Sequence, residues 1–248
     1  MSNQLFGNQD SINMRETKVG LVVAIHESEK HRPNGMYLFS QYIDAIFHSV
    51  DYPFKVYAFD NASQDQFEIE NNPDNLQITY IENQYKGGLT YTWNEGIKQG
   101  IKEDYDLYII TSDDQIFDKN INNFIKDILN HPLKNNAVFG PLSNNSNNHY
   151  QHGFSPNNKI FEINGTPGNE LNGFCLAMTK ETIKSNYFDD KENIFSTRDE
   201  DKWGHQDKEL QTRVKHSIVV GTCYLHHIKQ GGWREIREAD NLNLLSYE

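Results

Sequence analysis

The feature that most constrains the fold is an alternation of short apolar runs and segments of helical periodicity along the chain. The run at residues 19–25 is apolar almost throughout, as in a strand buried on both faces of a sheet. Residues 35–49 follow with apolar side chains at helical spacing, and Asn34 suits the N-cap. This alternation predicts an α/β fold with a mainly parallel central sheet flanked by helices. Further strands are expected at 54–59, 76–81, 107–110, 173–178 and 217–225, and further helices at 90–101, 120–130 and 206–215.

Two of the expected strands end in polar clusters, at residues 60–63 and 112–114. Ligands of parallel sheets bind beyond the carboxyl ends of the strands, so both clusters are expected on the ligand-binding edge. Ordinary turn chemistry is the alternative, because Asp, Asn and Ser are also common where strands end. The presence of two such clusters at strand ends favours a ligand-binding site over ordinary turns. The carboxylates of Asp113 and Asp114 can hold Mg²⁺ or Mn²⁺ while diphosphate oxygens complete the coordination.

The charge balance limits the classes of partner. The formal net charge is -12 at pH 7, which disfavours nucleic acid and an anionic membrane surface as ligands. A nucleotide can still bind an acidic protein when a divalent cation bridges its phosphates. No apolar stretch reaches the roughly 18 residues of a membrane span.

The organisation along the chain indicates one domain. Residues 1–17 lack the pattern of a signal peptide and are expected to form a flexible N-terminal arm before a single domain at 18–248. Residues 143–158 are rich in Asn and are expected to form a long loop, either a binding loop or a product of biased composition. Cys175 and Cys223 are expected to be free buried thiols in a reducing compartment, which favours a cytoplasmic location. Nothing in the sequence indicates the oligomeric state.

Several short motifs follow one another in a characteristic order. The buried strand KVGLVVAI precedes Asp60-Asn61-Ala62-Ser63-Gln64-Asp65, an Asn-x-Gly helix at residues 94–96 and a strand ending in Thr111-Ser112-Asp113-Asp114. A Gly-Phe-Cys strand at residues 173–175, the helix sequence QDKELQTR at 206–213 and His226-His227 come later. Over residues 18–233 this order resembles the family 2 glycosyltransferases of the GT-A fold. Two positions depart from the family pattern: Thr111 or Ser112 replaces the usual first Asp of the metal motif, and Gln206 replaces the Glu of a Glu-Asp pair.

The resemblance implies a role for each motif. Asp207 is the expected catalytic base, which takes the proton of the acceptor hydroxyl in an inverting transfer. The expected metal ligands for Mn²⁺ or Mg²⁺ are Asp113, Asp114 and one of His226 and His227, since neighbours on a strand point to opposite faces. The donor would be a UDP-, GDP- or dTDP-sugar, and the acceptor a glycan or another hydroxyl compound. The expected nucleotide-binding residues are Ala24, His26, Glu27, Asp60, Asn61, Ser63, Lys86, Asn94, Ser112 and Asp113.

Other interpretations of these residues stay open. Asp60 can cap a turn, Asp207 can favour a helix N-terminus through the macrodipole, and a histidine at a strand end is commonly structural. Trp203 and Trp233 can stack on a sugar or pack in the core. A sugar nucleotidyltransferase would need a Gly-rich, Arg-containing loop after the first strand, where this chain has Ala24 to Glu29. A non-catalytic nucleotide- or sugar-binding module derived from the same fold is the other alternative.

Overall fold

The structure, a computed structural model, describes residues 16–26, 34–61, 63, 67, 73–81, 88–163, 169–198 and 206–228. Every helix and strand expected from the sequence is present within these ranges. In chain order they are β1 (Val19–Ile25), α1 (Gly35–Ser49), β2 (Phe54–Asn61), β3 (Leu76–Ile81), α2 (Gly88–Lys102), β4 (Leu107–Ser112), β5 (Gln115–Ile116), α3 (Ile121–Asn130), β6 (Ala137–Ser143), β7 (Ile160–Ile163), β8 (Cys175–Thr179), α4 (Lys180–Lys184), α5 (Gln206–Val214) and β9 (His216–His227).

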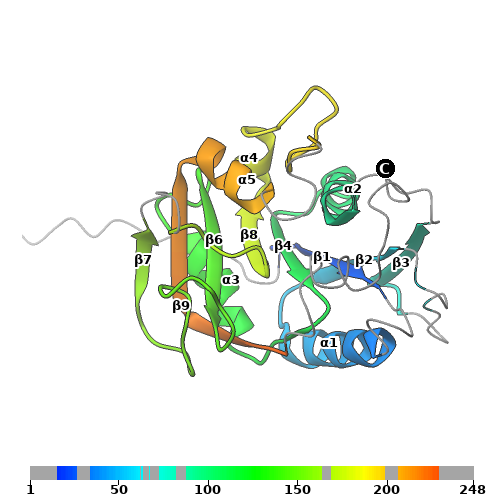
Figure 1. Cartoon of the computed structure of the whole chain (residues 1–248), viewed down its shortest axis with the longest axis horizontal. Helices are drawn as coiled ribbons and strands as arrows, with labels where there is room; N and C mark the ends of the chain where they lie inside the picture. Colours follow the sequence, from blue (N-terminus) through cyan, green and yellow to red (C-terminus); the bar gives the residue numbers. More distant parts are fainter. Residues whose placement is uncertain are drawn as a thin grey trace, which may run out of the picture.

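The strands of the described residues form one sheet, in the order β3-β2-β1-β4-β8-β6-β9-β5 with β7 on β9 (Figure 1). β3, β2, β1 and β4 are parallel to one another, which confirms the predicted parallel core of the sheet. β8 runs antiparallel between β4 and β6, and β9 runs parallel to β6. The sheet therefore brings the carboxyl ends of β1, β2 and β4 to the edge where β8 begins.

Helices cover both faces of the sheet, with α1 and α3 on one face and α2, α4 and α5 on the other (Figure 1). Alternate residues of β1 enter the two resulting cores: Val23 packs with Phe39 of α1, and Val22 packs with Trp93 of α2. Every residue of β1 is buried, as its continuous apolar sequence predicts. Gly96 lets α2 lie close to β1, because a side chain there would run into Val22.

The middle of the chain holds more regular structure than its sequence indicates. β6 contains Gly140 and Pro141, which usually mark turns. Proline lacks an N–H for the ladder, and the β6–β9 register shifts between Pro141 and Leu142. An irregularity inside a buried strand therefore looks like a loop in the sequence. Likewise β2 continues to Asn61, so Asp60 and Asn61 belong to the strand and not to the turn after it.

Cys175 and Cys223 are both free and buried, as expected. None of the helices built from described residues has the length and apolar character needed to cross a membrane. The expected N-terminal arm lies almost entirely outside the described residues.

Candidate active site

Three strand ends that the sequence analysis selected lie side by side (Figure 1). Ile25 at the end of β1 pairs with Asp60 of β2, and Ala24 pairs with Ser112 of β4. The ring of His26, just after β1, also contacts the end of β2, because its Nδ1 is 2.9 Å from the main-chain oxygen of Asn61. The structure thus brings together five of the residues predicted to bind nucleotide: Ala24, His26, Asp60, Asn61 and Ser112.

Asp60 holds the backbone that follows β2. Its side chain is fully buried, and its two carboxylate oxygens accept the main-chain N–H groups of Ser63 at 3.1 Å and Phe67 at 3.0 Å. These contacts correspond to the turn-stabilising role that the sequence left open. A contact with the base of a nucleotide stays a prediction, and it would use lone pairs of the carboxylate beyond those two.

The adjacent carboxylates after β4 have different surroundings. Asp113 is fully buried. Burial raises the pKa of Tyr42 on α1, and the nearby charge of Asp113 adds to the rise. Asp114 Oδ1 accepts hydrogen bonds from Ser112 Oγ at 2.6 Å and from Gln115 Nε2 at 3.0 Å. Its other oxygen, Oδ2, is 3.3 Å from Nε2 of His227, so Asp114 is the member of the pair that faces a second predicted metal ligand.

His227 is oriented by a main-chain carbonyl. Its Nδ1 lies 3.1 Å from the oxygen of Asn145, and because a carbonyl only accepts, Nδ1 carries the hydrogen. In the neutral ring, Nε2 then directs a lone pair toward Asp114. A histidine held in this way by a carbonyl is a typical metal ligand. The neighbouring His226 is exposed, so of the two predicted histidines His227 is the one beside Asp114.

A cation at this place would have two protein ligands. Across the described part of the chain, no group of three or more His, Cys, Asp or Glu side chains is arranged to hold a metal ion. Asp114 and His227 leave most coordination positions to other oxygens. Diphosphate oxygens and water commonly fill such positions around Mg²⁺, so the pair fits a cation that arrives with a nucleotide.

Asp207 lies in the first turn of α5 and is held by two main-chain N–H groups. Gly173 donates to its Oδ2 at 2.9 Å, and Lys208 donates to its Oδ1 at 2.9 Å. Burial raises the pKa of Asp207, the two hydrogen bonds oppose this rise, and the charge of Glu170 adds to it. A carboxylate with a raised pKa is a stronger base than an ordinary aspartate, which suits proton abstraction.

Gly173 and Phe174 connect Asp207 with the end of β4. Gly173 donates to Asp207, while the main-chain oxygen of Phe174 accepts the N–H of Ser112 at 3.4 Å. The ring centroid of Phe174 is 5.6 Å from that of His227. Asp207 thus contacts one residue of this dipeptide just before β8, and His227 of the Asp114–His227 pair lies beside the other.

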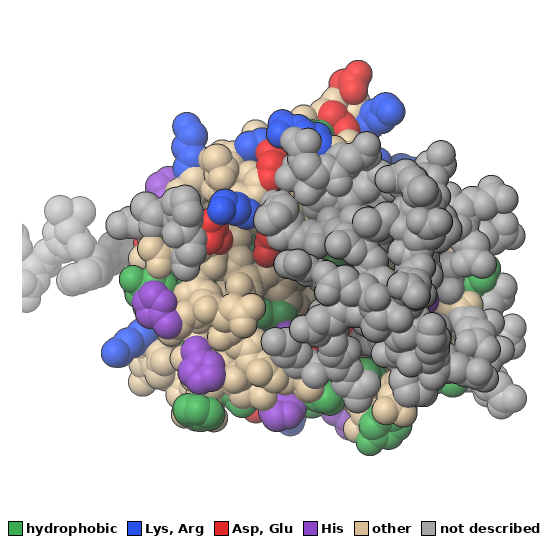
Figure 2. All heavy atoms as spheres, in the orientation of Figure 1, with side chains coloured by type: hydrophobic (Ala, Val, Ile, Leu, Met, Phe, Trp, Pro, Cys, Tyr) green, Lys and Arg blue, Asp and Glu red, His purple; other side chains and the backbone are tan. Residues whose placement is uncertain are grey.

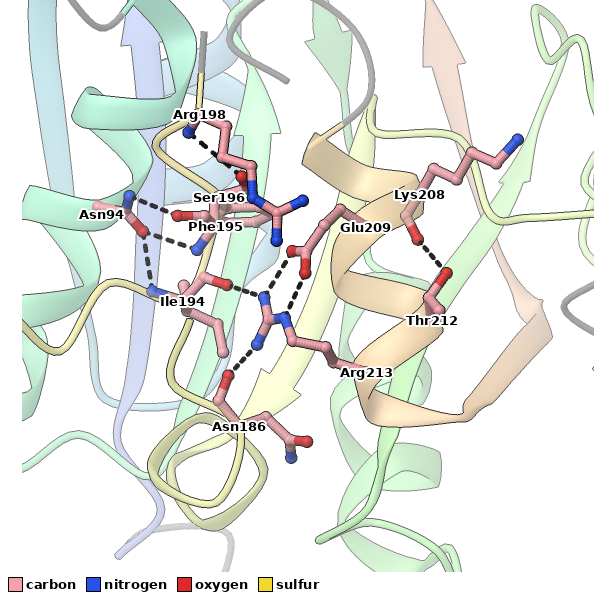
Figure 3. Close-up of polar contacts among 10 residues, drawn as sticks. All are labelled: Asn94, Asn186, Ile194, Phe195, Ser196, Arg198, Lys208, Glu209, Thr212 and Arg213. Carbon is pink, nitrogen blue, oxygen red and sulfur yellow. Dashed lines mark hydrogen bonds and ion pairs between the residues drawn. The ribbon is translucent and has the colours of Figure 1, made fainter. Parts of the chain in front are cut away.

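Asn94 of α2 binds the segment at residues 186–196, called here the connecting segment (Figure 3). Its Oδ1 accepts the N–H groups of Ile194 at 3.0 Å and Phe195 at 2.9 Å, and its Nδ2 donates to the oxygen of Phe195 at 3.1 Å. The side chain is only 2% exposed. These bonds give Asn94 a role in holding the connecting segment, and its predicted contact with nucleotide stays a prediction.

Arg213 of α5 holds the same segment from the other side (Figure 3). Its guanidinium forms a two-point pair with Glu209, at 2.7 and 2.9 Å, and donates to the main-chain oxygens of Asn186 and Ile194. The connecting segment is thus bound by a side chain from α2 and a side chain from α5. It joins α2 to α5, the helix that carries Asp207.

The Asn-rich segment lies between β6 and β7 and contacts both parts of the candidate site. At its start, Asn144 Oδ1 accepts the N–H of His227 at 2.8 Å, and Asn145 Nδ2 donates to the oxygen of His227 at 3.0 Å. Further on, Asn148 Nδ2 donates to the oxygen of Glu170 at 2.5 Å. The segment therefore contacts the main chain of His227 and the main chain of Glu170, three residues before Gly173.

Four predicted residues lie outside the described residues: Glu27, Lys86, Trp203 and Trp233. In contrast, the side chains of Asn145, Gln151 and Gln211 contact backbone of the candidate site, although none of them was predicted as a site residue. Single Asn and Gln residues in a chain rich in both carry no local signal. Their partners are distant in sequence, so only the fold reveals them.

The described charged side chains near α4 and α5 are mixed in sign (Figure 2). Lys and Arg side chains lie beside Asp and Glu side chains there, and histidines lie on the side of β7. The described part of this face therefore presents no extended basic surface of the kind that binds a phosphate backbone.

Comparison with solved structures identifies the fold. S. aureus TarS 1-349 in complex with UDP matches with a TM-score of 0.58 at 16% sequence identity, over 93% of this chain and 65% of that chain. The complex of the same fragment with UDP-GlcNAc matches with a TM-score of 0.58 at 14% identity, over 93% and 66%. A longer S. aureus TarS structure matches with a TM-score of 0.56 at 17% identity, over 85% and 36%. The chain thus spans slightly less than two thirds of the 1-349 fragment.

These matches show that the chain has the GT-A-like fold, as the motif order implies. No protein-family model matches the sequence, and no curated protein matches it. The fold assignment therefore rests on the structure.

Proposed function

We propose that the chain is a glycosyltransferase that moves a sugar from a nucleotide-sugar donor to an acceptor hydroxyl. The observation that carries this proposal is the arrangement around Gly173 and Phe174. A carboxylate with a raised pKa, Asp207, is bonded to Gly173, and His227 of the Asp114–His227 pair lies beside Phe174. The TarS structures of the same fold are complexes with UDP and UDP-GlcNAc, which supports a nucleotide-sugar donor for this chain.

The donor would bind along the ends of β1, β2 and β4. The nucleotide would lie near Ala24, His26 and Asp60, with its diphosphate toward Asp114. UDP, GDP and dTDP are all compatible with this placement, because no described residue selects the base. The pairing of Ile25 with Asp60 and of Ala24 with Ser112 supports one continuous binding edge.

A Mn²⁺ or Mg²⁺ ion would be held by Asp114 Oδ2 and His227 Nε2. Bound there, the cation would neutralise negative charge on the departing nucleoside diphosphate. The protein contributes the orientation of both ligands: Ser112 and Gln115 fix the other carboxylate oxygen of Asp114, and the carbonyl of Asn145 fixes the imidazole of His227.

Asp207 would act as the base of an inverting displacement. The acceptor oxygen forms a bond to the anomeric carbon while the bond from that carbon to the diphosphate oxygen breaks. The proton of the acceptor hydroxyl passes to the carboxylate of Asp207, so the enzyme needs no covalent intermediate. The Gly173 and Lys208 N–H groups hold the carboxylate while leaving lone pairs for the hydroxyl.

A nucleotide-binding module without catalysis is the second candidate. It is favoured by Gln206, which stands where the family has a Glu, and by the small number of protein ligands for a cation. Asp207 is retained, however, and burial raises the pKa of its carboxyl, which supports a role as a base. The two candidates differ in turnover but not in nucleotide binding.

The test combines binding and turnover. UDP, GDP and dTDP are screened by thermal shift with and without Mn²⁺, and the matching sugar donors are then tested for hydrolysis and transfer. A ligand at about 100 times its Kd stabilises the native state by about 2.7 kcal/mol, or about 5–10 °C in a chain of this size. We expect one diphosphate to give such a shift with Mn²⁺ and its sugar donor to be consumed. Binding without consumption would establish the module, and no binding by any diphosphate would contradict both candidates.

The proposed cation site is tested with the variants Asp114→Asn and His227→Ala. Each should remove the Mn²⁺-dependent part of the nucleotide-induced shift and leave any Mn²⁺-independent part. His226→Ala is the matched control, because His226 is exposed and points away from Asp114. An equal loss in the control would contradict the assignment of His227.

A further inference from the structure

Three consecutive main-chain N–H groups next to the candidate site donate to side-chain oxygens. Leu171 donates to Gln211 Oε1 at 2.7 Å, Asn172 donates to Gln151 Oε1 at 2.7 Å, and Gly173 donates to Asp207 Oδ2 at 2.9 Å. No strand holds this tripeptide, because β8 begins only at Cys175. Its position therefore depends on three side chains, one of which is the proposed base.

Gln211 fixes the first residue of the tripeptide. It accepts the N–H of Leu171 and donates to the oxygen of Leu171 at 2.8 Å, so it pairs with this residue as a neighbouring strand would. It also accepts from Ser217 Oγ at 2.8 Å and donates to the oxygen of Asp207 at 3.1 Å, which uses all four of its hydrogen-bonding positions. Gln211 and Asp207 are four residues apart on α5 and thus share one face of the helix.

Gln151 fixes the middle residue from the opposite side. It belongs to the Asn-rich segment between β6 and β7 and is fully buried. Its Oε1 accepts the N–H of Asn172, and its Nε2 donates to the oxygen of Pro141 at 3.1 Å. The β6–β9 register shifts just after Pro141, and the Gln151 side chain supplies a donor to the Pro141 carbonyl at this irregularity. Gln151 therefore anchors the tripeptide to β6.

We propose that Gln211 and Gln151 are positioning residues for Asp207: they hold the Leu171–Gly173 backbone so that the Gly173 N–H fixes the carboxylate in its productive orientation. The proposal rests on the proposed function, in which Asp207 is the base. The two amides bond Leu171 and Asn172, the two residues before Gly173, and both glutamine side chains are buried. Their loss should leave nucleotide binding intact and misplace the base.

The test is a double-mutant comparison with Gln211→Met and Gln151→Met. Methionine has about the same length as glutamine and makes none of these hydrogen bonds. Misplacement of a catalytic group by about 1 Å can cost about 10²-fold in rate, so we expect each variant to lower kcat by about 10- to 100-fold. The donor KM and the Kd of the nucleoside diphosphate should stay near the wild-type values.

The same substitutions are then made in an Asp207→Asn background. If the glutamines act through Asp207, they should lower the residual turnover little once the base is gone. Equal fold losses with and without Asp207 would overturn the proposal, as would a folded Gln211→Met or Gln151→Met protein with wild-type kcat. Two variants from different elements keep the test available if one fails to fold.

Thr182→Val is the matched control. Thr182 is fully buried and donates to the main-chain oxygen of Lys134 at 3.0 Å. It follows the end of β8 that pairs with the start of β4, at the opposite edge of the sheet from Ser112. It should lower stability without changing kcat per folded molecule. Absence of transfer by the wild-type chain would instead count against the proposed function, so the two failures are distinguishable.

Discussion

Asn94→Ala provides a sharp test of how the structure is held together near the site. Three hydrogen bonds join the Asn94 amide to Ile194 and Phe195, which are both fully buried. Alanine leaves two N–H groups and one carbonyl of the connecting segment without these partners. The segment is also bound to α5 by Arg213, so loosening it affects the helix that carries Asp207.

The magnitude follows from those three bonds. A buried polar group left unsatisfied costs about 1–3 kcal/mol, and the space left by the amide can admit a water molecule that recovers part of this cost. We therefore expect a loss of about 2–4 kcal/mol in the free energy of unfolding. For a chain of this length, about 2–4 °C in Tm corresponds to each kcal/mol, which gives a fall of about 5–15 °C.

Urea unfolding and thermal shift measure this loss, and Glu95→Ala on the same helix is the control. Glu95 forms only a partly exposed pair with Lys98 at 2.9 Å, so its removal should cost less than about 0.5 kcal/mol. A similarly small loss of stability in Asn94→Ala would refute the role of Asn94 in holding the connecting segment. If nucleoside-diphosphate affinity fell tenfold while stability was retained, Asn94 would be the nucleotide contact that the sequence predicted.

Two further predictions concern Asp207. In Gly173→Ala the added Cβ would lie 3.0 Å from Asp207 Oδ2 and 3.3 Å from the Cβ of Asp207. We therefore expect transfer, measured as turnover, to fall at least tenfold, while nucleotide affinity, measured by titration, is unchanged. Wild-type turnover would contradict a role for the Gly173–Asp207 contact. The pKa of Asp207 is raised by burial, and the base works only when ionised, so kcat/KM should fall as pH drops through a value above the ordinary aspartate pKa. An acid limb at or below the ordinary pKa would exclude Asp207.

The parallel core of the sheet and the convergence of its strand ends could be predicted from the sequence. Apolar runs at residues 19–25 and 107–110 indicate buried strands, and the rule that ligands bind at their carboxyl ends places Asp60 and Asp114 on one edge. The register of β1 with β2 and β4 confirms this geometry. These features are predictable because each depends on a local pattern.

The parts that the sequence did not reveal depend on contacts between distant residues. β6 was not predicted because it contains Gly140 and Pro141, which usually mark turns, and the bond from Gln151 to the Pro141 carbonyl is visible only in the fold. The choice of His227 over His226 depends on the direction in which each side chain leaves β9, and this direction follows from pairing with β5. Asp60 and Asn94 were selected as nucleotide contacts, whereas the structure shows their polar atoms bonded to nearby backbone.

The central claim is that Asp207 is the base of a sugar transfer, and the most direct measurement compares two quantities in one variant, Asp207→Asn. The substitution retains the shape of the side chain and removes its basicity. General-base catalysis contributes about 10²–10⁴-fold, so turnover should fall by that factor while the Kd of the nucleoside diphosphate stays near the wild-type value. Turnover close to wild type would contradict the claim and assign the base to another carboxylate, with Glu209 and Asp201 the next to test.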